Sequence, residues 1–350
     1  MTDPAKSIRV AAAQISPVFL DREATVDKAI EHIALAAKQG VNLIGFGEAW
    51  LPGYPWWIYL VSPIKGFPFA QRLYENAVEV PSQTTDRLCK AARDNGIYVV
   101  IGLTEKDRGS LYLAQLFIDP EGRIIGHRRK LKPTHNERAV WGEGDGSDII
   151  VVKTEFGNVG ALNCWEHLQP LTRFAMNYLN EQIHVSAWPG FSLYTGIMHS
   201  FSAEANLAAS RSYALETQTF VIHVGPHTDA ETVEMLCDDE HSASLLRVGG
   251  GYSEIIDPNG KTIGGPLDPD TEGLVIADCD LSLIGAARMA NDPAGHYARA
   301  DVLQLVFNRS PRRAVVFRDV VPSGESKPKE LAEASALLSI VPPEPNVAGL

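Results

Sequence analysis

The amino-acid sequence predicts an α/β fold. Short apolar runs rich in Val and Ile alternate with segments whose apolar residues recur with the 3.6-residue period of a helix. One pattern also occurs twice: the runs 117–126 and 255–264 both read as strand, Asp-Pro-X-Gly turn, strand. This repetition favours two related halves with hairpins at matching places, although Asp-Pro-X-Gly is also a common turn. We therefore expect a pseudo-two-fold architecture that includes antiparallel strand pairs.

The first half is expected to start with a strand at 9–15. A helix follows because Val26, Ile30 and Ile33 share one face, and Gly40 then provides a C-cap. A strand at 41–47 leads directly to Glu48. The remaining elements expected here are an aromatic loop at 50–59, a helix at 85–95 ending at Gly96, a strand at 97–103, and a hairpin of strands at 110–118 and 123–127.

The second half is expected to continue the alternation. A hairpin at 149–163 turns at 156–158 and ends just before Cys164. From about Asp319 onward the pattern dissolves into Pro, Glu, Lys and Ser. We expect one domain over 8–318 and a tail over 319–350 that is loosely ordered or dependent on oligomerisation. The later elements expected in the domain are a helix at 171–181, a strand at 183–188, a helix at 202–215 and a strand at 219–224.

The composition limits the partners of the protein. The 350 residues carry 31 Lys and Arg against 43 Asp and Glu, a net charge of −12, which disfavours nucleic acid or an anionic membrane as the main partner. There is no uncharged apolar run of 18 residues, and the first residues lack the pattern of a signal peptide. Four cysteines without regular spacing fit a reducing compartment. We expect a cytoplasmic protein with a small substrate that is not strongly anionic.

Cys164 is the first candidate for chemistry. It lies at an expected strand-to-helix corner, where nearby helix amides favour a thiolate. A free cysteine more often behaves as a small buried hydrophobe, and we adopt that interpretation for Cys89, Cys237 and Cys279. A catalytic role for Cys164 therefore depends on partners elsewhere in the chain.

Glu48, Lys130 and Cys164 each follow an expected strand. Ligands in α/β sheets collect beyond the carboxyl ends of strands, so these three side chains could converge. A thiol needs a base or a cation to become a nucleophile, a buried carboxylate is such a base, and a lysine stabilises an anionic intermediate. Taken singly, Glu48 could instead be a solvated strand end, Lys130 part of the basic run 128–132, and Cys164 a core residue.

Five segments together resemble the nitrilase branch of the carbon-nitrogen hydrolase superfamily. The resemblance covers roughly residues 8–310, in the order of the family's motifs. The segments are FGEAWLPGYPWW at 46–57, RKLKPTHNER at 129–138, GEGDGS at 142–147, NCWEHLQP at 163–170 and DPAGHYAR at 292–299.

The resemblance implies a fold and a set of catalytic residues. The implied fold is a four-layer α-β-β-α sandwich that dimerises sheet-end to sheet-end and, in longer nitrilases, extends into spiral oligomers. Glu48 is implied as general base, Lys130 as the stabilising cation, Cys164 as nucleophile and Glu137 as a second glutamate that supports the lysine and positions substrate. Lys132 competes with Lys130 for the lysine position. The usual proline before the glutamate is replaced by Gly47, which puts the rigidity of Glu48 in doubt.

The implied reaction converts a nitrile to a carboxylic acid and ammonia through a thioimidate and a thioester on Cys164. This path needs no metal and no organic cofactor. His127, His135, His167 and His296 lack metal-ligand spacing, and we expect structural or positioning roles for them.

Aromatic residues near the site segments indicate an apolar pocket. The stretch 186–194 resembles that of nitrilases acting on arylacetonitriles, which makes such a nitrile the expected substrate; aliphatic nitriles and cyanide stay open. Aromatic residues are also common in protein cores. Rival interpretations are an amidase or carbamoylase of the same superfamily and a catalytically silent scaffold subunit. The residues expected to contact substrate are Tyr54, Trp165, His167, Trp188 and Phe191.

Overall fold

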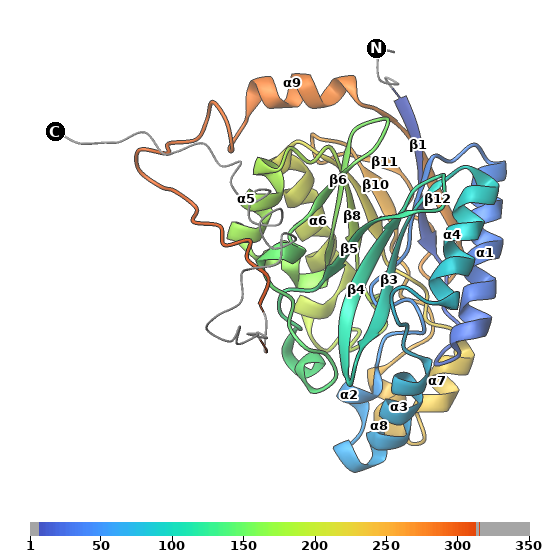
Figure 1. Ribbon diagram of the computed structural model, residues 1–350. Coiled ribbons are helices and arrows are strands. Elements are labelled where there is room, and N and C mark those ends of the chain that lie inside the picture. The colour runs from blue at the N-terminus through green and yellow to red at the C-terminus, as the bar shows by residue number, and fades with distance from the viewer. Residues whose placement is uncertain (1–6, 313–314, 316–350) are drawn as a thin grey trace, which may run out of the picture. The chain divides into compact units, whose positions relative to one another are not determined.

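Two mixed β-sheets form the centre of the computed structural model, which describes residues 7–312 and 315 (Figure 1). Each sheet has six strands. The first sheet has the order β12 (Gly273–Asp280), β1 (Ser7–Gln14), β2 (Leu43–Gly45), β3 (Tyr98–Asp107), β4 (Ser110–Ile118) and β5 (Ile124–Arg129). The second has the order β6 (Val151–Lys153), β7 (Asn158–Asn163), β8 (Ile183–Ala187), β9 (Phe220–Val224), β10 (Glu254–Ile256) and β11 (Thr262–Gly264).

The two sheets are built alike. From β12 to β5 the successive pairings are antiparallel, parallel, parallel, antiparallel and antiparallel. From β6 to β11 the same sequence of pairings recurs. The two Asp-Pro-X-Gly turns join β4 to β5 and β10 to β11, at corresponding edges of the two sheets. The predicted pseudo-two-fold arrangement with matching hairpins is therefore confirmed.

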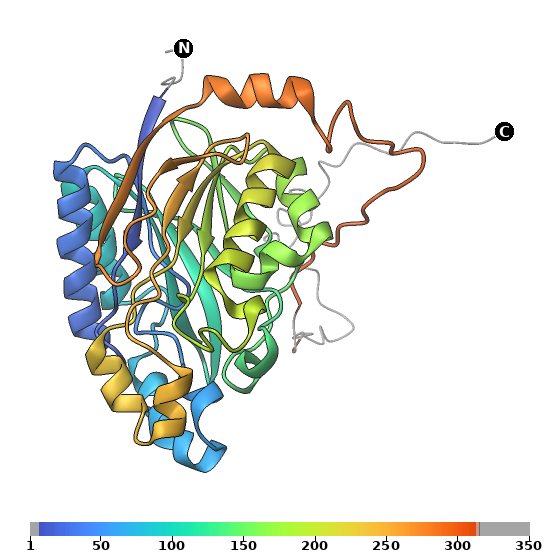
Figure 2. The same cartoon turned by 180° about the vertical axis from the view of Figure 1, so that it is seen from behind.

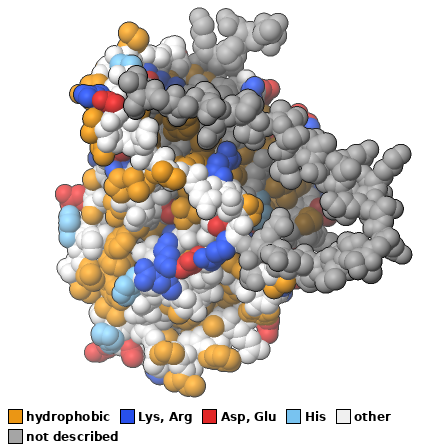
Figure 3. All heavy atoms as spheres, turned by 60° about the vertical axis from the view of Figure 1, so that its left-hand side comes forward, with side chains coloured by type: hydrophobic (Ala, Val, Ile, Leu, Met, Phe, Trp, Pro, Cys, Tyr) orange, Lys and Arg blue, Asp and Glu red, His pale blue; other side chains and the backbone are white. Residues whose placement is uncertain are grey.

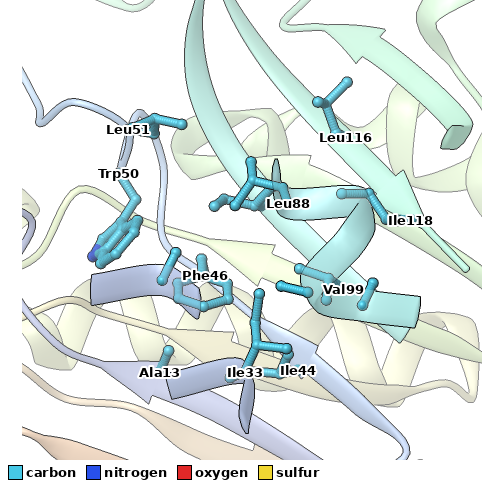
Figure 4. Packing of buried hydrophobic residues seen from close by; sticks show 14 of the residues in the cluster. Ala13, Ile33, Ile44, Phe46, Trp50, Leu51, Leu88, Val99, Leu116 and Ile118 are labelled. Atoms are coloured by element: carbon cyan, nitrogen blue, oxygen red, sulfur yellow. The ribbon is translucent and has the colours of Figure 1, made fainter. Parts of the chain in front are cut away.

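Helices cover the outer face of each sheet. Helices α1 (Arg22–Lys38) and α4 (Gln83–Asn95) lie on one side, and α5 (Pro170–Tyr178) and α6 (Ala203–Thr217) lie on the other (Figures 1 and 2). Figure 4 shows Ile33 and Leu88 packing onto strand residues such as Ile44. A separate core lies between the sheets, where Leu43 belongs to the same cluster as Val185. This confirms the implied four-layer α-β-β-α sandwich.

Local sequence explains where the helices on the first sheet begin and end. The side chain of Asp21 accepts a hydrogen bond from the Ala24 N–H, which caps α1. Ser82 and Thr85 form a reciprocal capping box at the start of α4. Gly96 ends α4 in the left-handed conformation with φ of 60°, which glycine adopts without strain. The predicted helix at 85–95 and its end at Gly96 are confirmed.

Five helices were not expected from the sequence. Helices α2 (Trp57–Leu60) and α3 (Pro63–Asn76) begin inside or just after the predicted aromatic loop at 50–59, so that loop prediction was wrong at its end. They join a cluster in which Trp57 and Leu73 share a core with Leu236, a contact distant in sequence that no local pattern reveals. The other unexpected helices are α7 (Ala230–Leu236), α8 (Glu240–Leu245) and α9 (Ser282–Ala290).

Two further predictions concern the second half. The helix expected at 171–181 ends earlier, since α5 stops at Tyr178 and Asn180 has a φ of 61°. The predicted tail at 319–350 lies outside the described residues, so its state and the boundary at 318 stay predictions. Within the part of the chain that is described, no helix has the length and apolar character needed to cross a bilayer.

Candidate active site

Three of the predicted site residues lie just beyond strand ends. Glu48 follows β2 by three residues, Lys130 directly follows β5, and Cys164 directly follows β7. Strands β2 and β5 belong to the first sheet and β7 to the second. The site is therefore assembled from both sheets, at the strand ends where the topology favours a ligand site.

The structure brings these side chains together. Lys130 Nζ donates hydrogen bonds to Glu48 Oε1 at 2.6 Å and to Glu137 Oε2 at 2.8 Å. One carboxylate oxygen of Glu48, one carboxylate oxygen of Glu137 and the Cys164 sulfur all lie within 4.8 Å of one another. Glu48, Lys130 and Glu137 are each 1% exposed and Cys164 is 8% exposed. Lys132, by contrast, has a largely exposed side chain paired with Glu143.

Glu137 is fixed from three directions. It lies in the short 3-10 helix η1 (His135–Ala139), where the Thr134 N–H donates to its Oε2 at 2.6 Å. The Tyr54 hydroxyl donates to its Oε1 at 2.7 Å. Together with Lys130, these donors compensate the negative charge of a buried carboxylate, which would otherwise be costly. Glu137 therefore holds the Lys130 ammonium in place beside Glu48.

Burial controls the protonation of the group. Burial raises the pKa of Glu48 to about 8; Lys130 lowers it in part, and Glu137 adds to the rise. Burial and the Glu48 carboxylate raise the pKa of the Cys164 thiol well above its usual value. Burial alone would lower the pKa of Lys130, but the carboxylates of Glu137 and Glu48 have the larger combined effect and raise this pKa. The resting site thus holds a neutral thiol, an ammonium and a carboxyl group that titrates near neutrality.

The second oxygen of Glu48 is available for proton transfer. Among the described residues, Glu48 Oε2 has no hydrogen-bond partner, whereas Oε1 accepts from Lys130. A buried acceptor without a partner is uncommon in a folded protein and calls for a functional explanation. A Glu48 carboxylate oxygen lies within 4.8 Å of the Cys164 sulfur, so this carboxylate is suited to take the thiol proton.

Cys164 occupies a strained corner. Its φ is 48°, a left-handed conformation that costs a non-glycine residue about 1–3 kcal/mol. It begins the 3-10 helix η3 (Cys164–Leu168), and the Trp165 backbone N–H partly offsets the rise in the pKa of the thiol. Strain of this kind persists only where the surroundings fix the backbone, which is frequent at active sites.

Glu166 is the residue that connects this corner to the Lys130 segment. Its carboxylate accepts from the Asn163 N–H at 2.8 Å and from the Leu131 N–H at 3.0 Å, and it pairs with Arg128 at 2.7 Å. The sequence interpretation missed both Arg128 and Glu166. The available signal was a charged residue two positions before Lys130 and another, of opposite charge, two positions after Cys164.

Gly47 permits a close backbone approach. A Cβ atom at this position would lie 2.7 Å from the Pro226 ring and 2.9 Å from the Trp188 carbonyl oxygen. The next residue donates its own N–H to that same Trp188 oxygen at 2.9 Å. Glu48 is thus held by a backbone hydrogen bond and by Lys130, and the glycine makes room for this arrangement.

A Gly47→Ala variant is expected to be less stable by about 1–3 kcal/mol, because the added methyl group would meet backbone and a proline ring that cannot rotate away. Urea unfolding measures the change. Gly285→Ala is the matched control, since a Cβ there meets nothing within 4 Å and α9 gains helix propensity. Equal stability of the two variants would contradict the close approach at Gly47.

A pocket opens onto Cys164 and Glu137. Four of the five residues predicted to contact substrate line it: Tyr54, Trp165, Trp188 and Phe191. His167 does not; it is fully buried, and its Nδ1 lies 2.6 Å from the carbonyl oxygen of Cys164. The sequence interpretation did not assign the other lining residues, which are Trp56, Tyr59, Thr134, Pro189, Gly190, Leu193, Phe201 and Asn206.

Glu48, Glu137 and Cys164 also form a group of potential metal ligands among the described residues. The Lys130 ammonium already bonds both carboxylates and therefore provides the positive charge at this point. Two carboxylates around an ammonium, beside a thiol, suit nucleophilic catalysis at an electrophilic carbon.

Residues 9–289 match the family model described as carbon-nitrogen hydrolase. The chain belongs to the carbon-nitrogen hydrolase family. The match spans both sheets and all three of the residues Glu48, Lys130 and Cys164.

Relatives of this carbon-nitrogen hydrolase include named nitrilases. An aliphatic nitrilase of Rhodococcus rhodochrous is 48% identical over 310 residues, covering 88% of this chain and 85% of that protein. An arylacetone-specific nitrilase of Alcaligenes faecalis is 44% identical, covering 92% of both chains. The crystal structure of Saccharomyces cerevisiae Nit3, of the nitrilase superfamily, superposes with a TM-score of 0.66 at 20% identity, covering 84% of this chain and 97% of Nit3. The predicted resemblance to nitrilases is confirmed.

Proposed function

We propose that the protein is a nitrilase that hydrolyses an apolar nitrile to the carboxylic acid and ammonia. One observation carries this proposal: the buried Lys130 ammonium bonds Glu48 and Glu137 directly beside the Cys164 thiol. The nitrilases that are 44% and 48% identical over most of their length support the choice of nitriles over other carbon-nitrogen substrates.

The arrangement of these side chains supports the following steps. Glu48 Oε2 takes the thiol proton while the Cys164 sulfur adds to the nitrile carbon, and the nitrile nitrogen receives that proton to give a thioimidate. Water adds to the thioimidate, the C–N bond breaks and ammonia leaves, giving a thioester. A second water, deprotonated by Glu48, breaks the C–S bond and releases the acid. Lys130 and the Trp165 N–H stabilise the negative charge that develops in each addition.

The pocket supports an aromatic nitrile such as an arylacetonitrile. Trp188 and Phe191 form one wall with ring centroids 5.8 Å apart, and Trp165 packs against Phe201 at 5.5 Å. Flat apolar walls of this kind favour an aryl group. The Tyr54 and Thr134 side chains add polar groups near Glu137, at the end of the pocket where the reacting carbon would lie.

A matched set of nitriles and amides tests the reaction. Ammonia and acid release should be measured from phenylacetonitrile and phenylacetamide, and from an aliphatic pair of similar polarity. Turnover of the nitriles with aryl preference is the expected result. Turnover of amides alone would contradict nitrile hydrolysis and favour an amidase, and no adduct on Cys164 with any substrate would favour a silent scaffold.

The pH dependence of kcat/KM should follow the ionisation of the Glu48 carboxyl group. Because burial places its pKa at about 8 and only the ionised form accepts a proton, kcat/KM should rise with pH and level off above about 8. Lys130 stays protonated over this range because its pKa is raised. Initial rates between about pH 6 and 9, with melting temperature checked at each pH, measure this. A rate that falls as pH rises would contradict Glu48 as the base.

We further propose a cytoplasmic homo-oligomer, built from dimers. Hydrophobic side chains lie exposed among charged ones on the face shown in Figure 3. On the second sheet's outer helix α5, Leu171 and Tyr178 lie two helical turns apart and are 67% and 71% exposed, and exposed apolar residues that share a face are typical of an interface. Sedimentation velocity on the full chain tests the assembly, and a monomer at all concentrations would contradict it.

A further inference from the structure

Four buried polar residues form a chain behind Cys164 that the mechanism above does not use. Tyr213 of α6, Glu181, His184 of β8 and His167 of η3 are each fully buried, and none of them lines the pocket. Burying four such groups is costly unless each hydrogen bond is made. Their shared position therefore calls for an explanation beyond core packing.

The hydrogen bonds run in one direction and end at the nucleophile. The Tyr213 hydroxyl donates to Glu181 Oε2, and Glu181 Oε1 lies 2.7 Å from His184 Nδ1. His184 Nε2 lies 2.8 Å from His167 Nε2. His167 Nδ1 lies 2.6 Å from the carbonyl oxygen of Cys164. The chain thus connects α6 to the strained backbone of the cysteine.

The positions of the protons on these side chains can be assigned by starting from the Cys164 carbonyl oxygen. A carbonyl oxygen only accepts, so His167 Nδ1 must carry hydrogen, and in a neutral ring its Nε2 must then accept. His184 Nε2 must therefore carry the hydrogen between the rings, which leaves His184 Nδ1 as an acceptor. Glu181 must then donate from a protonated Oε1.

The titration behaviour of these groups agrees with this assignment. Burial raises the pKa of Glu181 to about 8 and lowers the pKa values of both histidines well below the usual range. If the proton instead moves from Glu181 to His184, the resulting imidazolium still donates from Nε2 to His167. Both placements of that proton give His167 the same tautomer, with hydrogen on Nδ1.

Packing around the four hydrogen-bonded side chains holds them in place. A Cβ atom at position 160 of β7 would lie 2.0 Å from Glu181 Oε1, so Gly160 makes room for the carboxyl group. The His184 ring stacks on Tyr213 with centroids 4.0 Å apart. The His167 ring stacks on Trp188, a wall of the substrate pocket, at 5.3 Å. A ring that is stacked on one face and hydrogen-bonded at both nitrogens has little freedom to turn.

We propose that Glu181, His184 and His167 are positioning residues: they fix one tautomer of His167 so that its Nδ1–H holds the Cys164 carbonyl and keeps the thiol in its strained, attack-ready orientation. This inference rests on the proposed function only for its effect on the rate of reaction with a nitrile. The tautomer of His167 does not depend on the proposed function. It replaces direct substrate contact as the role of His167.

Two substitutions at Glu181 separate hydrogen bonding from bulk. Glu181→Gln keeps an N–H donor for His184 and an oxygen acceptor for Tyr213, and it should change the rate of Cys164 adduct formation less than about threefold. Glu181→Met removes the donor to His184, so His184 and His167 can both adopt the opposite tautomer. His167 Nδ1 would then be an acceptor facing another acceptor, the carbonyl oxygen of Cys164. Its rate of adduct formation should fall by roughly tenfold or more with little change in KM. Tyr213→Phe leaves the three donors toward Cys164 intact and is the control.

Nitrogen-15 NMR of histidine-labelled full-length protein reads the tautomer directly. Hydrogen on Nδ1 of His167 is expected in the unaltered protein and in Glu181→Gln, and its loss is expected in Glu181→Met. The alkylation rate of Cys164 by iodoacetamide should follow the same order without any nitrile present. A His167 tautomer with hydrogen on Nε2 in the unaltered protein, or equal rates in the Gln and Met variants, would overturn the proposal. Correct tautomers and alkylation rates without nitrile turnover would instead overturn only the proposed reaction.

Discussion

Cys164→Ala is expected to abolish nitrile hydrolysis, lowering kcat on the order of 10⁴-fold or more, because Cys164 carries the only thiol among the described residues that line the pocket. The structure should be unchanged, since the pocket loses a single sulfur atom. Ammonia release measures the turnover, and mass spectrometry of quenched reactions measures the adduct on the peptide that contains residue 164.

Cys89→Ala is the matched control for this experiment. Cys89 is a half-buried thiol of α4 on the far side of the first sheet, and it is not among the residues that line the pocket. Its removal should leave both turnover and adduct intact. Residual nitrile hydrolysis in Cys164→Ala at more than a trace, or an adduct on another cysteine, would refute the assignment of the nucleophile.

Lys130→Met should damage both activity and stability. It leaves Glu48 and Glu137 as two buried carboxyl groups without their cation, and breaking a buried pair from one side typically costs about 3–5 kcal/mol. Losing a donor that stabilises the intermediate typically lowers kcat by about 10²–10³-fold. Urea unfolding and single-turnover adduct formation measure the two effects. Protonation of one carboxyl group should relieve part of the instability at low pH.

Lys132→Met provides the comparison, because the sequence motif contains both lysines. The Lys132 side chain is 59% exposed and pairs only at the surface with Glu143, an arrangement worth about 0–1 kcal/mol. Its replacement should leave kcat within about twofold and stability nearly unchanged. The reverse ranking of the two variants would show that the site uses Lys132.

Much of the architecture could be predicted from the sequence because strand and helix patterns are local. The repeated hairpin, the C-cap at Gly96 and the positions of Glu48 and Cys164 at strand ends all rest on neighbouring residues. Helices α2 and α3 were missed because contacts with distant residues, such as that of Trp57's cluster with Leu236, stabilise them.

The residues of the site could be predicted from the sequence, but the residues that hold them in place could not. The motifs indicated Glu48, Lys130, Cys164 and Glu137, and the structure places them in contact range; their roles stay predictions for the variants above. Sequence spacing could not show that Glu166 spans the segments after β5 and β7, or that the His167 ring faces away from the pocket. The first depends on how the two sheets meet, and the second depends on how η3 packs against β8; no single segment encodes either contact.

The Glu166 carboxylate has a consequence for how the protein tolerates substitution. Glu48 and Lys130 follow strands of the first sheet and Cys164 follows a strand of the second, and Glu166 hydrogen-bonds to the backbone at both strand ends. A substitution that shifts one sheet would therefore also displace the site residue that the other sheet positions.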